Sequence, residues 1–332
     1  MNINVIDLSN CPWNERNGTY GGMAGSKEGI TYNNEYWIVK YPKSTKDMRV
    51  DDLSYTTAPL SEFIGSKIYE ILEYNVHKTM LAYRSDKIVV ACKDFCKKEG
   101  SLREIRTLKN VYNKELEEIL DNSLHSTGSS HSVDLDELLI HLNKNPILAN
   151  IEGIKERFWE CVVIDGFINN NDRNNGNWGL IYENGEYNLA PIFDNGAAFY
   201  NKISDSKIAN RLTDIEKLES SATGIETIYS RNGHKFRYKH ILELDNAELK
   251  EAIKKVVPKI KTHFEEIKDL IYSIPEEYKG KTIISPIRKE FYIKGMELRL
   301  EKLLIPVLNK DMEKKSLLEK APTTSKSKEY ER

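Results

Sequence analysis

Short runs in which apolar and polar residues alternate open the chain, and this period of two predicts β-strands. Residues 29–32 and 35–41 flank an Asn-Asn pair, which tolerates the positive φ of a tight hairpin turn. Two further extended runs cover residues 78–83 and 87–92. Between the two pairs of strands, Pro59 opens a segment whose apolar residues recur at helical spacing: Leu60, Phe63, Ile64, Ile68, Ile71 and Leu72. The first part of the chain therefore predicts a small sheet with one helix.

From about residue 99 the spacing of apolar residues becomes helical. A strongly apolar helix is predicted over residues 151–168. A second helix is predicted over residues 246–271, where Pro258 is expected to impose a kink or a break. Residues 178–182 and 186–192 predict two strands, because the Asn-Gly pair between them is a strong hairpin signal. Helices therefore dominate this part of the chain, with one hairpin among them.

Together these elements predict an α+β protein with two lobes. The small, β-rich lobe covers residues 1–98 and has the layout of a nucleotide-covering lobe, and the larger, mainly helical lobe covers residues 99–308. A chain of 332 residues is long enough for one such two-lobed domain. The Lys-, Glu- and Ser-rich residues 309–332 predict a disordered tail.

Composition narrows the class of protein without identifying it. The 39% hydrophobic and 30% charged content is that of an ordinary soluble globular protein. The formal net charge of −2 gives no global basic field, so we expect no nucleic-acid partner. No apolar run approaches the roughly 18 residues that span a bilayer, and the N-terminus lacks the basic flank and apolar core of a signal peptide. We therefore expect a cytoplasmic protein, with non-classical delivery to a host cell left open.

One stretch of the chain carries the candidate chemistry. Asp172, Asn177 and Asp194 are the kinds of group that phosphoryl transfer from ATP needs. One carboxylate would orient or deprotonate the attacking hydroxyl, while the carboxamide and the second carboxylate would hold Mg²⁺. The apolar helix leads directly into Asp172, and the later hairpin returns the chain so that Asp194 can lie near Asn177. Because Asp and Asn are also common turn formers, each motif alone would indicate only a loop.

A lysine and a glutamate upstream would complete a nucleotide site. Lys40 lies in an otherwise apolar strand, where its charge is costly to bury unless phosphate oxygens or a carboxylate compensate it. Glu62 is the predicted partner, with Glu70 and Glu73 on the same predicted helix as alternatives. The glycine-rich residues 17–29 could lay backbone N–H groups over phosphates, although they form neither a G-x-G-x-x-G nor a Walker A sequence.

With these motifs in place, the chain resembles the HipA-like serine/threonine kinases, including their compact pro-inflammatory branch. The matching blocks follow the family's order from about Gly21 to Asp194 and include its D-x4-N loop and P-x-Y-D metal block. The resemblance implies a protein-kinase-like fold that transfers phosphate from ATP, with Mg²⁺, to Ser or Thr hydroxyls of a protein substrate.

The matched blocks also imply which residues form the site. Asp172, Asn177 and Lys40 are the expected catalytic residues, and Asn177 and Asp194 are the expected ligands of Mg²⁺. The expected ATP-binding residues belong to the phosphate loop, the lysine strand, the helix that pairs with it and the segment that passes the adenine: Gly21, Gly22, Ala24, Gly25, Ser26, Lys40, Glu62, Lys93 and Phe95.

The chain departs from the longer toxin kinases of this family in two ways. Because the phosphate loop begins near residue 18, we expect their extra N-terminal subdomain to be missing here, and we expect no dedicated antitoxin partner. Those kinases also autophosphorylate a serine whose position is occupied here by Gly22. Self-phosphorylation would therefore need another acceptor, and Thr19, Tyr20 and Ser26 are the candidates.

Three alternative functions stay open. Asp172, Arg173, Gly176 and Asn177 also look like the D-R-H-x-G-N loop of phosphoinositide kinases, with Asn174 in place of the histidine. A lipid kinase is therefore the main alternative, although the chain lacks a dense basic patch for a membrane. A small-molecule phosphotransferase would share the loop but need a closed substrate pocket. A non-catalytic binding module is disfavoured, because every expected polar group is present.

Residues 197–240 follow the second aspartate of the candidate site. They contain three hydroxyl residues, Ser220, Ser221 and Thr223. Their position alone suggests a regulatory or substrate loop.

Overall fold

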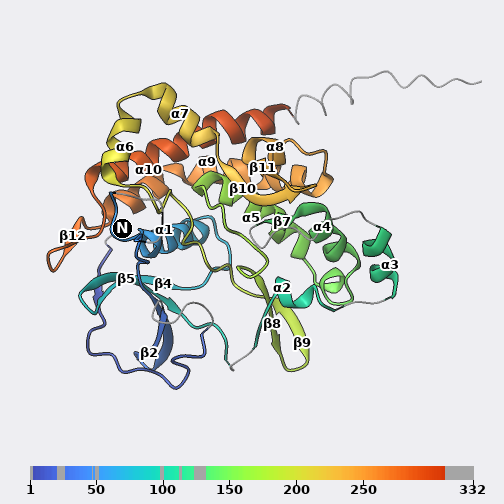
Figure 1. Cartoon of the computed structure of the whole chain (residues 1–332), viewed down its shortest axis with the longest axis horizontal. Helices are drawn as coiled ribbons and strands as arrows, with labels where there is room; N and C mark the ends of the chain where they lie inside the picture. Colours follow the sequence, from blue (N-terminus) through green and yellow to red (C-terminus); the bar gives the residue numbers. More distant parts are fainter. Residues whose placement is uncertain are drawn as a thin grey trace, which may run out of the picture.

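The computed structural model describes residues 3–20, 27–46, 48, 52–97, 101–111, 114–122 and 132–310, which form an α+β molecule (Figure 1). Its amino-terminal part is a five-stranded sheet in the order β1-β4-β5-β3-β2. Strand β1 pairs parallel to β4, and the other neighbours are antiparallel. The strands are β1 (Ile6–Asp7), β2 (Lys27–Tyr32), β3 (Glu35–Lys40), β4 (Thr79–Arg84) and β5 (Lys87–Lys93).

The predicted strand pairs of this sheet are confirmed. Asn33 and Asn34 adopt φ angles of 51° and 59° between β2 and β3. Positive φ at both central residues gives the two-residue turn whose twist matches that of the paired strands. The resulting register sets Lys40, at the end of β3, directly opposite Lys27, at the start of β2. Two lysines therefore lie side by side at one end of the sheet.

Helix α1 (Ala58–Ile71) forms where the apolar spacing predicts it and packs against β4 and β5. Pro59 lies in its first turn, where the missing backbone N–H would have no helical partner anyway. Ile64 and Ile68 are fully buried, and Glu62 is only 1% exposed, so this helix carries a carboxylate into the core. The loop after α1 reaches the helical part, because His77 donates its backbone N–H to the carbonyl of Ile192 at 3.0 Å.

The rest of the described chain is mainly helical, as predicted. Its helices are α2 (Ile105–Leu108), α3 (Lys114–Asn122), α4 (Leu135–Lys144), α5 (Ile154–Ile168), α6 (Asp205–Leu212), α7 (Ile215–Thr223), α8 (Tyr238–Leu242), α9 (Ala247–Ser273) and α10 (Pro286–Arg299), with the short turns η1 (Leu148–Asn150) and η2 (Leu300–Leu304). Three small sheets lie among them: β6 (Leu102–Glu104), β8 (Gly179–Glu183) and β9 (Glu186–Leu189); β7 (Val133–Asp134), β10 (Glu226–Arg231) and β11 (His234–Arg237); and β12 (Glu277–Tyr278) with β13 (Lys281–Thr282).

Helix α5 is the centre of this part. From Phe158 to its end it is buried on all sides, as is typical of a helix inside a core, and it packs against α9. Its carboxyl end is closed by Asn169 in the left-handed conformation, with φ of 54°, just before the loop that carries Asp172. The predicted hairpin after that loop is confirmed as β8 and β9, which turn at Asn184 and Gly185 with φ of 55° and 87°.

A break in the helix at Pro258 and a single loop over residues 197–240, both expected for the carboxyl-terminal half, are not found. Helix α9 runs without a break through Pro258, because Val257 and Ile260 beside it are buried in the core and Pro258 itself is exposed. Residues 197–240 do not form a single loop. They fold into α6, α7 and the β10–β11 hairpin, and the three hydroxyl residues named above lie in α7.

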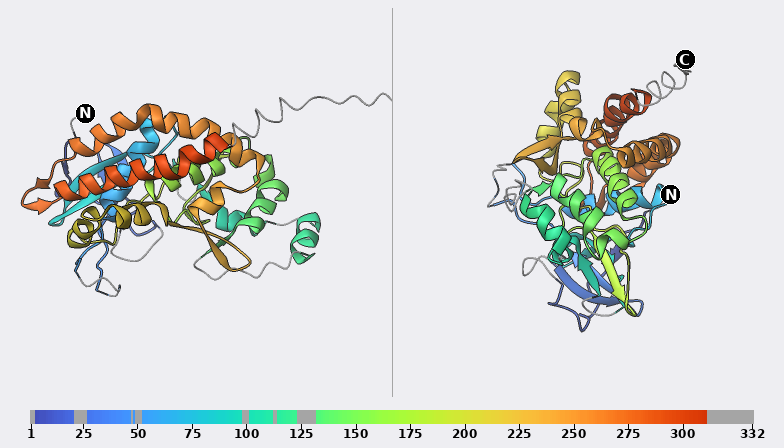
Figure 2. Two further views of the ribbon diagram at one scale, coloured as in Figure 1. Left: turned by 90° about the horizontal axis from the view of Figure 1, so that it is seen from above. Right: turned by 90° about the vertical axis from the view of Figure 1, so that its right-hand side faces the viewer.

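Helices α9 and α10 run along one side of the molecule and cover both parts of the chain (Figure 1, Figure 2). The β12–β13 hairpin between them reaches the first sheet, where Lys281 pairs with Asp86 at 2.7 Å and Lys279 pairs with Asp7. The carboxyl-terminal segment thus contacts both the first sheet and the helical part. The lobe boundary near residue 98 stays a prediction, and most of the predicted tail, residues 311–332, lies outside the described residues.

Candidate active site

A cleft of about 370 Å³ brings together the polar residues that the sequence analysis selected from distant segments. Strand β3 contributes Lys40, and α1 contributes Glu62. The loops around the β8–β9 hairpin contribute three more lining residues: Asp172, Asn177 and Asp194. The geometry that the hairpin predicted, with both aspartates and the asparagine at one cleft, is therefore found.

Lys40 lies between two carboxylates. Its Nζ is 2.8 Å from Asp194 Oδ1 and 3.2 Å from Glu62 Oε2. Burial alone would lower the pKa of Lys40, but Asp194 and Glu62 outweigh it and hold that pKa well above its usual range. Lys40 is therefore a permanent cation at the wall of the cleft. Glu62 of α1 is therefore the carboxylate that pairs with Lys40, whereas Glu70 pairs with Lys67 and Glu73, just beyond α1, pairs with Lys259.

Asp194 is held by its backbone as well as by its side chain. It adopts the left-handed conformation, with φ of 62°, which Asp tolerates better than most residues. Its backbone N–H donates to Glu62 Oε1 at 3.1 Å, so α1 fixes both Lys40 and this loop. Burial raises the pKa of Asp194 and the Lys40 ammonium lowers it more, so the net shift is downward and the carboxylate stays charged.

Asp172 and Asn177 belong to one compact loop. Asn177 donates from its side-chain Nδ2 to the carbonyl of Asp172, and Asn174 donates from Nδ2 to Asp172 Oδ1 at 2.9 Å. The Asp172 side chain is exposed to the cleft. Within the described part of the chain, neither Asn177 Oδ1 nor Asp194 Oδ2 accepts a hydrogen bond. A carboxamide and a carboxylate oxygen are thus free for a hard cation such as Mg²⁺, so the donor set fits that metal.

Arg173 is the residue whose role the sequence analysis missed. It is 3% exposed, and it forms two hydrogen bonds to Asp165 on α5, at 2.9 and 3.0 Å. It also donates to the carbonyls of Asn177 and Phe193, at 3.2 and 2.5 Å. Burial alone would lower the pKa of Arg173, but Asp165 holds it well above its usual range. One buried guanidinium therefore joins the Asp172 loop to the Asp194 loop.

The same network continues to α1 through Asn195. Arg173 donates to Asn195 Oδ1 at 2.5 Å, and Asn195 Nδ2 donates to Ser66 Oγ at 3.0 Å. Gly65 permits this close approach, because a Cβ at that position would lie 2.8 Å from the Cβ of Asn195. The polar core therefore runs without interruption from α5 to α1, beneath the cleft.

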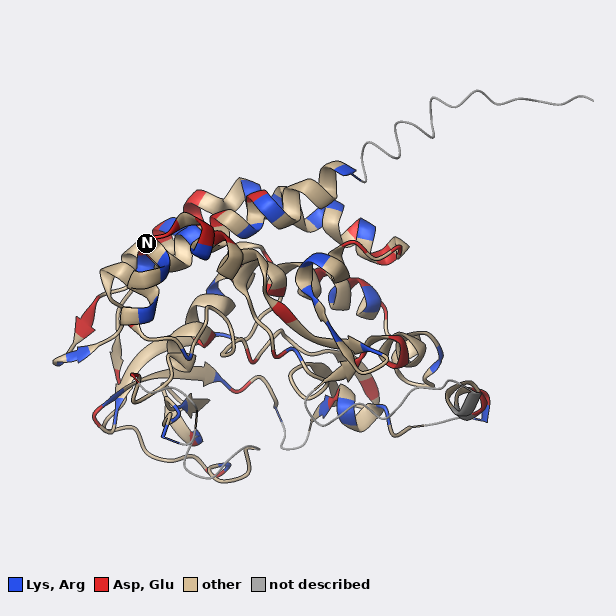
Figure 3. Ribbon diagram, turned by 45° about the horizontal axis from the view of Figure 1, so that its top comes forward, with Lys and Arg blue, Asp and Glu red and all other residues tan. Residues whose placement is uncertain are grey.

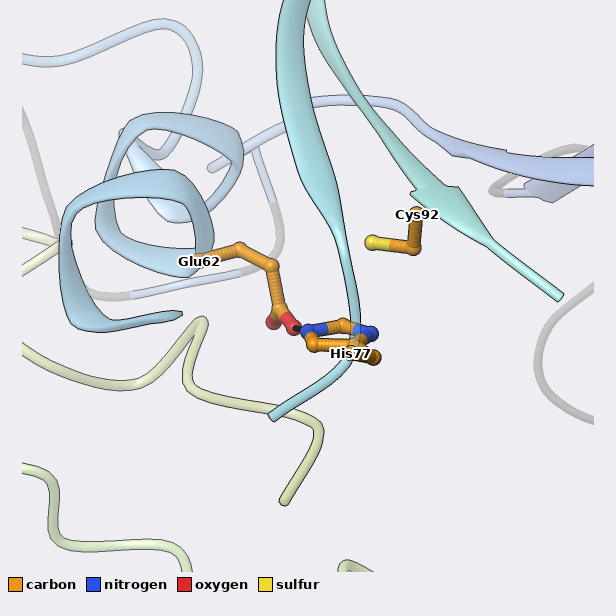
Figure 4. A group of neighbouring side chains, drawn as sticks. All are labelled: Glu62, His77 and Cys92. Carbon is orange, nitrogen blue, oxygen red and sulfur yellow. Dashed lines mark ion pairs between the residues drawn. The ribbon is translucent and has the colours of Figure 1, made fainter. Parts of the chain in front are cut away.

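Glu62, His77 and Cys92 form a buried group whose residue types could bind a metal (Figure 4). His77 Nε2 lies 3.0 Å from both Glu62 Oε1 and Ser66 Oγ, so this ring nitrogen already has partners within the protein. Burial raises the pKa of the Cys92 thiol, which disfavours the thiolate that binds metals. The carboxylate of Glu62 is also paired with the Lys40 ammonium. We therefore interpret this group as the support that orients Glu62 towards Lys40.

A second lysine at the cleft, Lys27, was not selected from the sequence. Burial, together with the positive charge of Lys40 across the strand pair, lowers the pKa of Lys27. The cross-strand register is the signal that could have found it, because it places Lys27 beside Lys40. An anion in the cleft would therefore meet two ammonium groups.

The structure does not place the remaining expected ATP-binding residues at the cleft. Lys93 pairs with Glu35 and does not line the cleft, and Phe95 stacks at a tilt on Phe193 with ring centroids 5.7 Å apart. Five residues of the predicted phosphate loop lie outside the described residues: Gly21, Gly22, Ala24, Gly25 and Ser26. Their assignment to ATP stays a prediction.

The chain is 30% identical over 305 residues to the serine/threonine-protein kinase CtkA of Helicobacter pylori strain J99. The match covers 90% of this chain and 86% of that protein. The chain belongs to the CtkA family of serine/threonine protein kinases. This match confirms the expected class of enzyme, a serine/threonine protein kinase.

Two solved structures support the same fold. The crystal structure of the Helicobacter pylori proinflammatory kinase CtkA aligns with a TM-score of 0.78 at 28% identity, over 93% of this kinase and 99% of that chain. HipA, in a Shewanella oneidensis toxin–antitoxin complex with HipB and operator DNA, aligns with a TM-score of 0.51 at 12% identity, over 88% of this kinase and 69% of that chain. The predicted HipA-like kinase fold is therefore confirmed.

Two further comparisons gave negative results. No protein-family model matches the kinase. Among the helices of its described residues, none combines the length and the apolar character that crossing a membrane requires.

The buried charge of Glu62 makes a prediction about stability. Replacing Glu62 with Gln is expected to lower stability at pH 7 by about 3 kcal/mol, or roughly 5 °C in the unfolding midpoint, because Lys40 loses a buried partner. Burial raises the pKa of Glu62, but Lys40 and His77 lower it more, so it lies well below its usual range. The charged carboxylate thus stabilises the fold above its unfolded pKa of about 4.3, and this contribution is lost as the pH falls further. The difference between the variant and the unaltered protein should therefore shrink below about pH 4.

Thermal unfolding at pH 7 and at about pH 3, below the unfolded pKa of Glu62, measures this difference. Glu70→Gln is the matched control, since Glu70 lies on the same helix but is 58% exposed and pairs with Lys67 at the surface. Its midpoint should change by about 1 °C or less. Equal changes for the two variants, or a Glu62→Gln effect independent of pH, would contradict this account of the ion pair.

Proposed function

We propose that this kinase transfers the γ-phosphate of ATP, with Mg²⁺, to Ser or Thr hydroxyls of a protein. The observation that carries the proposal is the convergence of Lys40, Asp172, Asn177 and Asp194 on one cleft. Family membership supports a hydroxyl of a protein as the acceptor, rather than the lipid alternative. Self-phosphorylation, a cytoplasmic location and the lack of a dedicated antitoxin partner stay predictions from the sequence.

The proposed roles follow from the groups in the cleft. Asp172 would accept the proton of the attacking hydroxyl as its oxygen bonds to the γ-phosphorus and the bond to ADP breaks. Lys40 and Lys27 would hold phosphate oxygens, since both present ammonium groups to the cleft. Asn177 and Asp194 would hold Mg²⁺, which neutralises phosphate charge when it is bound. Arg173 touches none of the reacting groups and would act by positioning the two loops.

The metal role of Asp194 makes a prediction about binding. Asp194→Asn is expected to weaken Mg²⁺-dependent ATP binding at least tenfold, because the charged ligand is lost. Titration calorimetry with ATP, in Mg²⁺ and in EDTA, measures this change. Asp205→Asn is a suitable control, because Asp205 lies on α6, outside the cleft, where it pairs with Arg288. Unchanged Mg²⁺-dependent binding by Asp194→Asn would contradict the assignment, and no binding by the unaltered protein would contradict the proposed function.

A further inference from the structure

A second and larger cleft, of about 610 Å³, opens on the other side of Asp172. Asp172, Ala197, Asn201 and Lys202 line both this cleft and the one that holds Lys40, so the two meet at the proposed catalytic carboxylate. A nucleotide in the first cleft would present its γ-phosphate towards this junction. The acceptor hydroxyl must then approach from the second cleft.

The far wall of this second cleft is built by the β10–β11 hairpin. Glu226, Thr227 and Ile228 of β10 and Lys235 of β11 line it, and β10 pairs parallel to β7 at the rear. Tyr229 fixes the hairpin to the catalytic loop, because its buried hydroxyl donates to the carbonyl of Arg173 at 3.2 Å. The wall therefore has a defined position relative to Asp172.

The second cleft carries positive charge that no described residue neutralises with an ion pair. Elsewhere, lysines and arginines are interspersed with acidic residues along the long helices (Figure 3), as in the pairs Lys254–Glu251 and Lys255–Glu160. Lys202 and Lys235, by contrast, are exposed and form no ion pair with any described residue. Bringing a carboxylate to these two lysines would supply the counter-charge that they lack.

The other charged residues in and beside the second cleft leave its charge positive. Glu226 lies directly opposite Arg237 in the β10–β11 register, so a basic side chain faces the one acid of the hairpin wall. Arg106, at the opposite side, pairs with Glu104 at 2.6 Å. Lys239, which lies two residues after the end of β11, is exposed and adds positive charge beside the hairpin. Asp172 adds a negative charge at the junction of the two clefts, but along the hairpin Lys235, Arg237 and Lys239 outnumber Glu226, so the hairpin wall carries net positive charge.

We propose that the second cleft is the acceptor groove and that it selects Ser or Thr residues flanked by Asp or Glu. The inference rests on the proposed function and deepens it, because it names the class of protein segment that the site takes. Lys235, together with Lys202 nearer the junction, would pair with the acidic side chains of an extended segment. Ile228 and Val133 would pack against its apolar atoms.

Peptide phosphorylation tests this inference. Three sets of peptides share one Ser or Thr acceptor and carry Glu, Ala or Lys flanks. The unaltered kinase should show kcat/KM roughly tenfold higher for Glu flanks than for Ala flanks, mainly through KM, since two new charge pairs contribute about 1.4 kcal/mol. Lys235→Glu should remove most of this preference and favour Lys flanks. Lys261→Glu, at an exposed lysine of α9 outside the groove, should retain the preference for Glu.

Ionic strength provides a second measurement on the unaltered protein. The preference for Glu flanks should fade between about 0.05 M and about 1 M salt, where the screening length falls to about 3 Å. Equal rates for the three sets, or a preference for Glu that survives Lys235→Glu and high salt, would overturn the inference and leave the proposed function in place. No transfer to any peptide or to a generic protein substrate would overturn both.

Discussion

Replacing Asp172 with Asn is expected to lower the rate of phosphoryl transfer by about 10²–10⁴-fold while ATP binding is retained. Asn preserves the size of the side chain and can accept a hydrogen bond, but it cannot take up the proton of the attacking hydroxyl. Asn174, which donates to Asp172 Oδ1, and Asn177, which donates to its carbonyl, would still hold the loop. The expected result is therefore a loss of turnover without a loss of nucleotide affinity.

Single-turnover transfer of labelled phosphate, with ATP affinity measured by calorimetry, separates these two quantities. Asp269→Asn is a matched control, because Asp269 is exposed on α9 and lies outside both clefts. Its rate should equal that of the unaltered protein. A rate for Asp172→Asn within threefold of that value would remove Asp172 from the reaction.

Replacing Arg173 with Met is expected to destabilise the protein by about 3–5 kcal/mol, because Asp165 would stay buried without its charged partner. The change also removes the hydrogen bonds to the carbonyls of Asn177 and Phe193. The protein that remains folded should therefore transfer phosphate poorly, since the two loops are no longer held together.

A double-mutant cycle provides the control for Arg173. Asp165→Asn combined with Arg173→Met removes both charges, so the pair should be more stable than the sum of the single effects predicts. The unfolding midpoints of the four proteins give this coupling. Additive effects would mean that the guanidinium and the carboxylate do not act as a buried pair.

The parts of the fold that depend on neighbouring residues could be predicted from the sequence. The Asn-Asn and Asn-Gly turns fix two hairpins locally, and the apolar run before Asp172 gives α5. The β8–β9 hairpin begins just after Asn177 and ends shortly before Asp194. Because its two strands are antiparallel, the proximity of these two residues could also be inferred. Lys40 and Glu62 followed from the cost of burying a charged group without a partner.

Other features depend on contacts between distant segments, which one sequence does not reveal. In the sequence, Arg173 stands out only as part of a motif shared with lipid kinases, because its burial against Asp165 is a contact between distant segments. Helix α9 continues through Pro258 because core packing outweighs the local preference to break. The β10–β11 hairpin became a candidate acceptor wall only once its position beside Asp172 was known.

A crystal structure with Mg²⁺ and a non-hydrolysable ATP analogue tests the central claim most directly. The account predicts a metal ion about 2.0–2.1 Å from Asn177 Oδ1 and an Asp194 carboxylate oxygen. It also predicts that Lys40 Nζ contacts phosphate oxygens and that Asp172 faces the γ-phosphate from the side of the second cleft. A nucleotide bound outside the cleft of Lys40, or a metal held by neither Asn177 nor Asp194, would contradict it.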